Sequence, residues 1–341
     1  MKDSTEYVNE LASEAAAFNQ RISERRAIGF VPDIRRAVKS DYFYKSFWRD
    51  PHYVHLYLGW VIENHLTFLR KYAPPGAQVL DVGCGAGYFA LELARNGYHV
   101  IGFDIAEKAI EAARETLAGN PYTEGFGSLR YEVSSLLEAK GCYDAVFVSG
   151  VLHHLPDVNR AVAHLNLLLR DDGVVVAYEP CHERWRKADA AQVALIRGLL
   201  SLTGHWYEKP MDAGAFKASQ AFDQFVRDIH VEYITERDKS ESGGQSPLDN
   251  SADGDQILAA LRREFTILEQ LPAVSFIYRL LGGLRGDEKR IHRIADFLAL
   301  YDHYAVQQGF MQPNTFYVVA KKYQGRISAR STNEEAIMPN A

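Results

Sequence analysis

The sequence of 341 residues has few cysteines, no strong excess of charge of one sign and no long apolar run. Its three cysteines, Cys84, Cys142 and Cys181, are widely spaced, so neither a disulfide framework nor a CxxC metal site is indicated. The net charge of -6 provides no general field for nucleic acid, and we expect no nucleic-acid partner. No apolar stretch is long enough to cross a bilayer, so we expect no stable membrane insertion. The first thirty residues mix acids and bases without an apolar centre, which predicts a cytoplasmic protein.

Strand and helix signals alternate from residue 79 to residue 178, which is the main feature of the chain. The expected strands are 79–82, 99–103, 129–133, 145–148 and 174–178, and the expected helices between them are 86–96, 106–118 and 157–170. Such alternation with short connections implies right-handed crossovers and a parallel sheet covered by helices on both faces. The sequence therefore predicts an α/β fold.

The remaining segments indicate additions to this α/β core. Over about eighty residues after residue 180, the pattern is helical without a strand, which predicts an inserted cap. This cap contains a polar Gly- and Ser-rich loop at 239–255. The expected organisation is an N-terminal helical segment that covers the site (1–75), the core (76–181), the helical cap (182–263), two further strands with an intervening helix (264–323) and a disordered tail (324–341).

A glycine-rich turn follows the first core strand and indicates a ligand site. Gly83, Gly85 and Gly87 stand where ligands bind in an open α/β sheet, and glycine lets ligand atoms approach the main chain closely. The dinucleotide fingerprint would need a third glycine at position 88, where Tyr88 stands. The carboxylate of Asp81 also repels phosphate, but it suits a ligand with a positive amino group and a positive sulfonium.

Asp104 ends the next strand and adds a second carboxylate to this turn. A carboxylate at this place can accept hydrogen bonds from both hydroxyls of a ribose. A glycine turn alone is often just a tight connection between strand and helix. Together with Asp81 and Asp104, it predicts a site for a nucleoside with a cationic tail.

Four stretches in order, "LDVGCGAGYFA", "VIGFDIAEKAI", "YDAVFVSGVLHHLPD" and "LLRDDGVVVAYEP", resemble the motifs of class I S-adenosylmethionine-dependent methyltransferases. The resemblance runs from about residue 77 to 180. It implies a Rossmann-like fold with a seven-stranded, mostly parallel sheet, and S-adenosylmethionine as cofactor with S-adenosylhomocysteine as product. It also implies that the glycines wrap the methionine part of the cofactor.

The cofactor residues implied by this resemblance lie at the ends of the first four expected strands. They are Asp81, Gly83, Gly85, Gly87, Asp104, Ile105, Ser134, Ser135, Ser149 and Gly150. Asp104 would hold the ribose, and Ser149 and Gly150 would lie under the amino acid end. The family usually has an acid at the adenine position after the third strand, where this chain has Ser134 and Ser135, so a serine hydroxyl or the main chain would take that role.

The candidate catalytic residues are His153, His154 and Glu179, which follow the fourth and fifth strands. Methyl transfer is an in-line displacement, and a neutral hydroxyl acceptor must also lose its proton. A histidine titrates near neutrality and can act as the base, while a carboxylate can orient it. Adjacent loop residues point in different directions, so we expect His153 to be the base. His154 could instead form a hydrogen bond with the backbone and cap the following segment, and Glu179 could be a structural hydrogen-bond acceptor.

A metal-assisted methyltransferase would carry an acid at the end of the fourth strand and Asp-Asn after the fifth. This chain has Ser149 and Gly150 at the first place and Glu179, Pro180 and Cys181 at the second, so we expect no metal. The sequence thus predicts methyl transfer to an oxygen, or with less support a nitrogen, of a small organic molecule or a glycan. Two alternatives remain open. One is an aminopropyl transferase, which should have an acid at the same place, and the other is a catalytically inactive, cofactor-bound regulatory or assembly subunit. The sequence leaves the oligomeric state undetermined.

Overall fold

The computed structural model describes residues 4–41, 46–209, 219–235 and 246–323. The tail expected over 324–341 and the part of the expected loop from 239 to 245 lie outside the described residues. Among the described helices, none combines the length and the apolar character that a membrane span requires.

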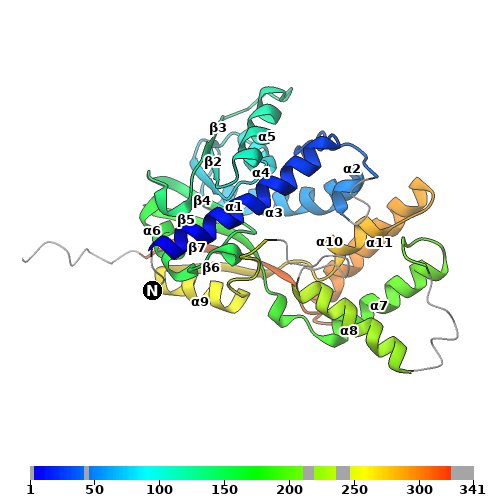
Figure 1. The fold of residues 1–341 in the computed structure, drawn as a ribbon. Coiled ribbons are helices and arrows are strands. Elements are labelled where there is room, and N and C mark those ends of the chain that lie inside the picture. The colour runs from blue at the N-terminus through cyan, green and yellow to red at the C-terminus, as the bar shows by residue number, and fades with distance from the viewer. Residues whose placement is uncertain (1–3, 42–45, 210–218, 236–245, 324–341) are drawn as a thin grey trace, which may run out of the picture.

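A seven-stranded sheet forms the centre of the molecule, with the strand order β3-β2-β1-β4-β5-β7-β6 (Figure 1). The strands are β1 (Gln78–Val82), β2 (His99–Asp104), β3 (Ser128–Val133), β4 (Tyr143–Ser149), β5 (Leu169–Pro180), β6 (Phe265–Pro272) and β7 (Thr315–Lys322). β7 runs antiparallel to both of its neighbours, and the other pairs are parallel. The predicted mostly parallel, seven-stranded sheet is confirmed.

Alternate residues along the strands pack into two separate cores, one on each face of the sheet. On β5, Val174 and Val176 join one cluster, while Val175 and Ala177 join the other. Strand side chains point to opposite faces in turn, so a strand covered on both faces is apolar at every position. The first core contains α3 (Trp60–Tyr72), α4 (Tyr88–Arg95) and α11 (Glu288–Gln307), and the second contains α6 (Val158–Leu168) and α9 (Gly254–Glu264). The remaining crossover helix is α5 (Glu107–Ala118).

Two helices after β5 bury apolar residues such as Val193 and Tyr233 in the first core. They are α7 (Lys187–Leu202) and α8 (Ser219–Thr235), which Figure 1 shows with the short α10 (Ile277–Leu280) and α11 at one end of the molecule. Helix α9 lies where the last part of the cap is expected, but its residues Ile257 and Leu261 are buried in the second core. Asp253 caps α9 by accepting the Gln256 N–H at 2.8 Å, so this helix begins within the segment expected as loop.

Helix α1 (Ser4–Ala27) crosses the carboxyl edge of the sheet and is held there by a buried ion pair. Glu14 lies 2.9 Å from His154 Nδ1 and also accepts the Leu248 N–H at 2.9 Å and the Ser246 hydroxyl. Burial opposes the charged form of Glu14, but the hydrogen bonds from His154, Ser246 and Leu248 outweigh it and lower the pKa of its carboxyl. Burial likewise opposes the charge on His154, yet Glu14 and the nearby acids raise its pKa above the ordinary value.

We expect this ion pair to make the stability of the fold depend on pH. A raised histidine pKa gives stabilisation that is present below the pKa of the unfolded chain and is lost as the pH rises through the folded value. A lowered carboxyl pKa gives stabilisation that is lost as the pH falls through its folded value. His154→Asn should therefore melt a few degrees below the wild type at pH 6, and the difference should shrink toward pH 9. Melting curves by circular dichroism test this, and a difference that stays constant with pH would contradict it.

Candidate functional site

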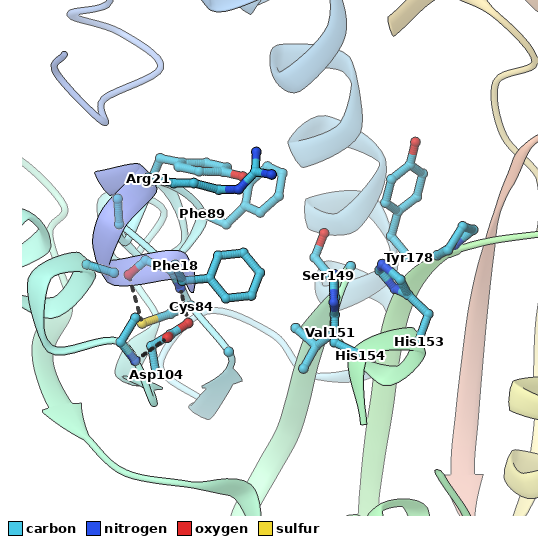
Figure 2. A pocket seen from close by; sticks show the side chains of 18 of the residues that line it. Phe18, Arg21, Cys84, Phe89, Asp104, Ser149, Val151, His153, His154 and Tyr178 are labelled. Carbon is cyan, nitrogen blue, oxygen red and sulfur yellow. Dashed lines mark hydrogen bonds between the residues drawn. The ribbon is translucent and has the colours of Figure 1, made fainter. Parts of the chain in front are cut away.

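A cavity of about 680 Å³ lies at the carboxyl ends of β1, β2, β4 and β5. Its walls come from α1, the glycine turn, the strand ends, and the helices α7, α8 and α10. In Figure 2, Asp104 and Cys84 lie at one side of this pocket, and His153, His154 and Tyr178 lie at the other. The predicted cofactor and catalytic residues thus meet at one cavity, with one exception among the glycines.

The three glycines of the turn have different physical reasons to lack a side chain. All three have positive φ, at 62°, 53° and 82° for Gly83, Gly85 and Gly87. A Cβ on Gly85 would point into open space, whereas one on Gly83 would lie 2.6 Å from the Val151 side chain. A Cβ on Gly87 would lie 2.5 Å from the Tyr131 hydroxyl, and Gly87 does not line the cavity. Gly87 is therefore required by packing at the start of α4, and Gly85 leaves room for a ligand.

Asp81 is buried at the end of β1 with part of its carboxylate unsatisfied. It is 2% exposed, and its Oδ2 has no hydrogen-bond partner among the described residues. Burial raises the pKa of this carboxyl well above its ordinary value, and the charge of Asp104 adds to the shift. A cation in the cavity would compensate the ionised form, so a ligand with a positive amino group fits this position.

Asp104 holds the turn closed with both carboxylate oxygens. Oδ2 accepts the Gly85 N–H at 2.9 Å, and Oδ1 accepts the Ala106 N–H at 2.8 Å. Burial raises the pKa of Asp104, while these backbone donors act in the opposite direction. Each carboxylate oxygen has a second lone pair, so both can still accept a ribose hydroxyl.

The remaining predicted cofactor residues also line the cavity, namely Ile105, Ser134, Ser135, Ser149 and Gly150. Ser135 has a structural partner as well, because its hydroxyl donates to Glu138 at 2.8 Å within a capping box. Gly150 has a φ of 67° and donates its N–H to the Tyr178 carbonyl at 2.8 Å, which joins the ends of β4 and β5.

Glu179 connects the two strand ends that carry the candidate catalytic residues. Its side chain is fully buried, and Oε1 accepts the backbone N–H groups of Val151 and Leu152 at 2.9 and 3.0 Å. Oε2 lies 2.8 Å from Nδ1 of His153. This contact fixes the orientation of the imidazole and directs Nδ1 to the carboxylate, so that the ring would act on a substrate through Nε2.

His154 serves a different partner from its neighbour, since its Nδ1 pairs with Glu14 of α1. The two imidazole rings lie 4.0 Å apart between centroids. His153, His154 and Asp249 each offer a ligand atom within 4.8 Å of the others, so these side chains could share a cation. The expected absence of a metal was based on the residues after the fourth and fifth strands, and that reasoning did not include Asp249. It stays a prediction.

Sequence reasoning missed Tyr57, Arg197 and Arg279, which line the cavity but belong to no contiguous motif. Tyr57 lies in a single π-helical turn (His55–Gly59), and its hydroxyl lies 3.1 Å from that of Tyr178. Tyr178 in turn donates to the Thr315 hydroxyl at 2.9 Å. Arg197 and Arg279 reach the same cavity from α7 and α10. The π-helical turn could not be read from the sequence, since its residues continue the apolar helical pattern.

Comparison with known proteins gives a family match and partial matches to relatives. A family model described as a methyltransferase domain matches residues 55–227. A ubiquinone biosynthesis O-methyltransferase from Xylella fastidiosa is 35% identical over 130 residues, which are 36% of this chain and 51% of that protein. A demethylmenaquinone methyltransferase from Desulfitobacterium hafniense is 29% identical over 110 residues, which are 31% of this chain and 44% of that protein. The chain matches about half the length of these curated relatives.

The solved structures show a weaker likeness. A methyltransferase from Methanosarcina mazei superposes with a TM-score of 0.45 at 14% identity, over 76% of this chain and 98% of that one. The matched family region contains the glycine turn, Asp104 and the pair of His153 and Glu179. The family model covers just over half of the chain. The chain therefore belongs to the methyltransferase-domain family, the class I S-adenosylmethionine-dependent methyltransferases.

Proposed function

We propose that this protein transfers a methyl group from S-adenosylmethionine to an oxygen, or with less support a nitrogen, of a small organic molecule or glycan. The observation that carries the proposal is the His153–Glu179 pair, which borders the same cavity as the glycine turn. When bound, the cofactor supplies an electrophilic methyl group on a positive sulfonium. Two relatives are named as a ubiquinone biosynthesis O-methyltransferase and a demethylmenaquinone methyltransferase, and these names are consistent with a small-molecule acceptor.

In this proposal the buried carboxylates bind the two ends of the cofactor. Asp81 compensates the positive amino group, since its Oδ2 is buried and has no hydrogen-bond partner among the described residues. Asp104 accepts the ribose hydroxyls while it holds the turn closed. The bare backbone at Gly85 leaves room for the methionine part. Ile105, Ser134 and Ser135 lie at the side where the adenine would bind.

His153 would remove the proton of the acceptor hydroxyl through Nε2. Glu179 keeps the ring in the required orientation and stabilises the imidazolium that forms. The backbone N–H groups of Val151 and Leu152 hold Glu179 in place. Phe18 of α1 and the cap helices wall the cavity, which limits the access of water to the reacting atoms.

The two alternative functions have less support. An aminopropyl transferase needs a carboxylate for the acceptor amine after the fourth strand, and this place holds Ser149 and Gly150. A cavity sealed by side chains would favour a cofactor-bound subunit without activity. The cavity of about 680 Å³ is of the size that binds small molecules.

The Asp81 assignment predicts that cofactor binding releases a proton. Because burial raises the pKa of Asp81 in the free protein, its carboxyl keeps its proton to a higher pH than an exposed aspartate does, and a bound ammonium group lowers that pKa. Titration calorimetry with S-adenosylhomocysteine at a series of pH values, in buffers of different ionisation enthalpy, should show release of up to about one proton over part of that series. Asp81→Asn should remove this release and weaken binding. An equal release from both proteins would assign the proton to another group.

The ribose assignment predicts a loss of affinity in Asp104→Ala. Loss of charge-assisted hydrogen bonds should weaken binding of S-adenosylhomocysteine by about tenfold or more. The matched control is Asp171→Ala, an exposed aspartate at the start of β5, which should bind as the wild type does. Calorimetry measures both, and unchanged affinity in a folded Asp104→Ala protein would remove the assignment.

The base assignment predicts that His153→Gln lowers turnover without changing cofactor affinity. The formation of S-adenosylhomocysteine with a set of phenols and other hydroxy compounds should fall by about 10²- to 10⁴-fold. His164→Gln is the control, because His164 is a partly buried histidine of α6 that bonds the Ala139 carbonyl away from the cavity. Full activity of the His153 variant would show that this residue is not the essential base.

A further inference from the structure

Part of the cavity is lined by residues outside all cofactor motifs. They belong to α7, α8, α10 and the segments next to them, and they are Arg197, Trp206, Tyr207, Glu232, Tyr278 and Arg279. The predicted cofactor residues lie at the ends of β1, β2, β3 and β4, so this part of the cavity remains for the acceptor. The inference developed here rests on the function proposed above.

Two arginines and one glutamate line this part of the cavity. Arg197 is 4% exposed and donates from Nη1 and Nη2 to the two carboxylate oxygens of Glu232, at 2.7 and 2.8 Å. Arg279 packs on the Tyr233 ring at 5.9 Å, and Arg197 lies 5.6 Å from the centre of that ring. Two guanidinium groups and one carboxylate thus line this part. A positive charge in a site of low dielectric constant favours a ligand with a negative charge.

Arg197 also has a donor that a ligand can use. Its Nε is buried and has no hydrogen-bond partner among the described residues. Buried donors in folded proteins are usually paired, and a guanidinium offers its donors in a fixed planar arrangement that matches a carboxylate. Glu232 accepts one hydrogen bond from each of Nη1 and Nη2, so Nε is the donor that a ligand oxygen could accept from.

The walls of the cavity are aromatic and fixed in place. The rings of Tyr57 and Tyr278 lie 5.9 Å apart and within 24° of parallel. The hydroxyl of Tyr57 contacts that of Tyr178, which is bonded to Thr315, so these side chains are held in one orientation. Flat apolar walls of this kind bind a planar ring well, because aromatic groups favour stacked or edge contacts.

We propose that the acceptor is an aromatic compound that carries a carboxylate, which Arg279 and Arg197 bind. Its ring would pack against Tyr57 and Tyr278, and its nucleophilic oxygen would face His153. Arg279 is then a residue that determines specificity, because it recognises the acid without contacting the atom that is methylated.

Matched pairs of ligands test this proposal without requiring turnover. The probes are 3,4-dihydroxybenzoate and 3-hydroxy-2-naphthoate, each compared with its neutral carboxamide. Binding is measured by calorimetry with the full chain saturated with S-adenosylhomocysteine. We expect at least one acid to bind about tenfold more tightly than its amide, because a charge-assisted pair with arginine is lost in the amide.

Variants of Arg279 then assign the preference to this residue. Arg279→Gln should abolish the preference for the acid, and Arg279→Lys should retain part of it, since the charge remains but the planar donor set is lost. Arg227→Gln is the matched control, because Arg227 lies on α8 and makes its ion pair with Asp223 at the exposed surface. It should keep the full preference. Melting curves identify any variant that fails to fold, and the comparison of acid and amide in the wild type remains a test in that case.

The outcomes separate this inference from the proposed function. Failure of the wild type to bind S-adenosylhomocysteine would defeat the proposed function. Binding of S-adenosylhomocysteine without any preference for the acids, or with no binding of the acids, would overturn this inference alone. A preference that persists in a folded Arg279→Gln protein would also overturn it.

Discussion

This site depends on one constraint: each carboxylate buried at the carboxyl edge of the sheet needs a hydrogen-bond donor or a positive charge beside it. Glu179 is compensated by His153 and two backbone N–H groups, and Glu14 by His154, Ser246 and the Leu248 N–H. Asp81 has no ion pair among the described residues, and its Oδ2 has no hydrogen-bond partner there. A buried charge without a partner is costly, so Glu179 and Glu14 are compensated within the fold, whereas Asp81 is the position where we propose that a cationic ligand binds.

The adjacent histidines show how one motif can serve two structural purposes. His153 faces Glu179 of β5, and His154 faces Glu14 of α1, although the two rings are neighbours. The first contact orients a candidate base, and the second holds a helix across the cavity. Asp157, the last residue of the same motif, accepts the Arg160 N–H at 3.0 Å and caps α6. The proposed catalytic role, the contact with α1 and the cap of α6 thus lie within six residues.

The proposed acceptor side of the cavity is built from segments that are far apart in sequence. Tyr57 comes from a π-helical turn before the core, Arg197 from α7, and Arg279 from α10 after β6. Burial of Arg197 among aromatic rings strengthens the interactions of its charge, because the local dielectric constant is low. The cofactor end, by contrast, uses short segments that follow single strands. This division suits a family in which one cofactor serves many acceptors.

The sequence by itself determined the sheet and placed the predicted cofactor residues at one edge of it, since short apolar runs, a glycine turn and a terminal acid are local patterns. The sequence also located Asp81, Asp104, His153 and Glu179. These residues lie at or shortly after the carboxyl ends of strands, and those ends meet at one edge of the sheet. Tertiary structure alone decided that Gly87 serves the packing of Tyr131, that α9 supports the sheet, and that His154 binds α1. The acceptor wall was likewise undetermined, because contacts across some two hundred residues depend on how helices pack and leave no periodic signal in the chain.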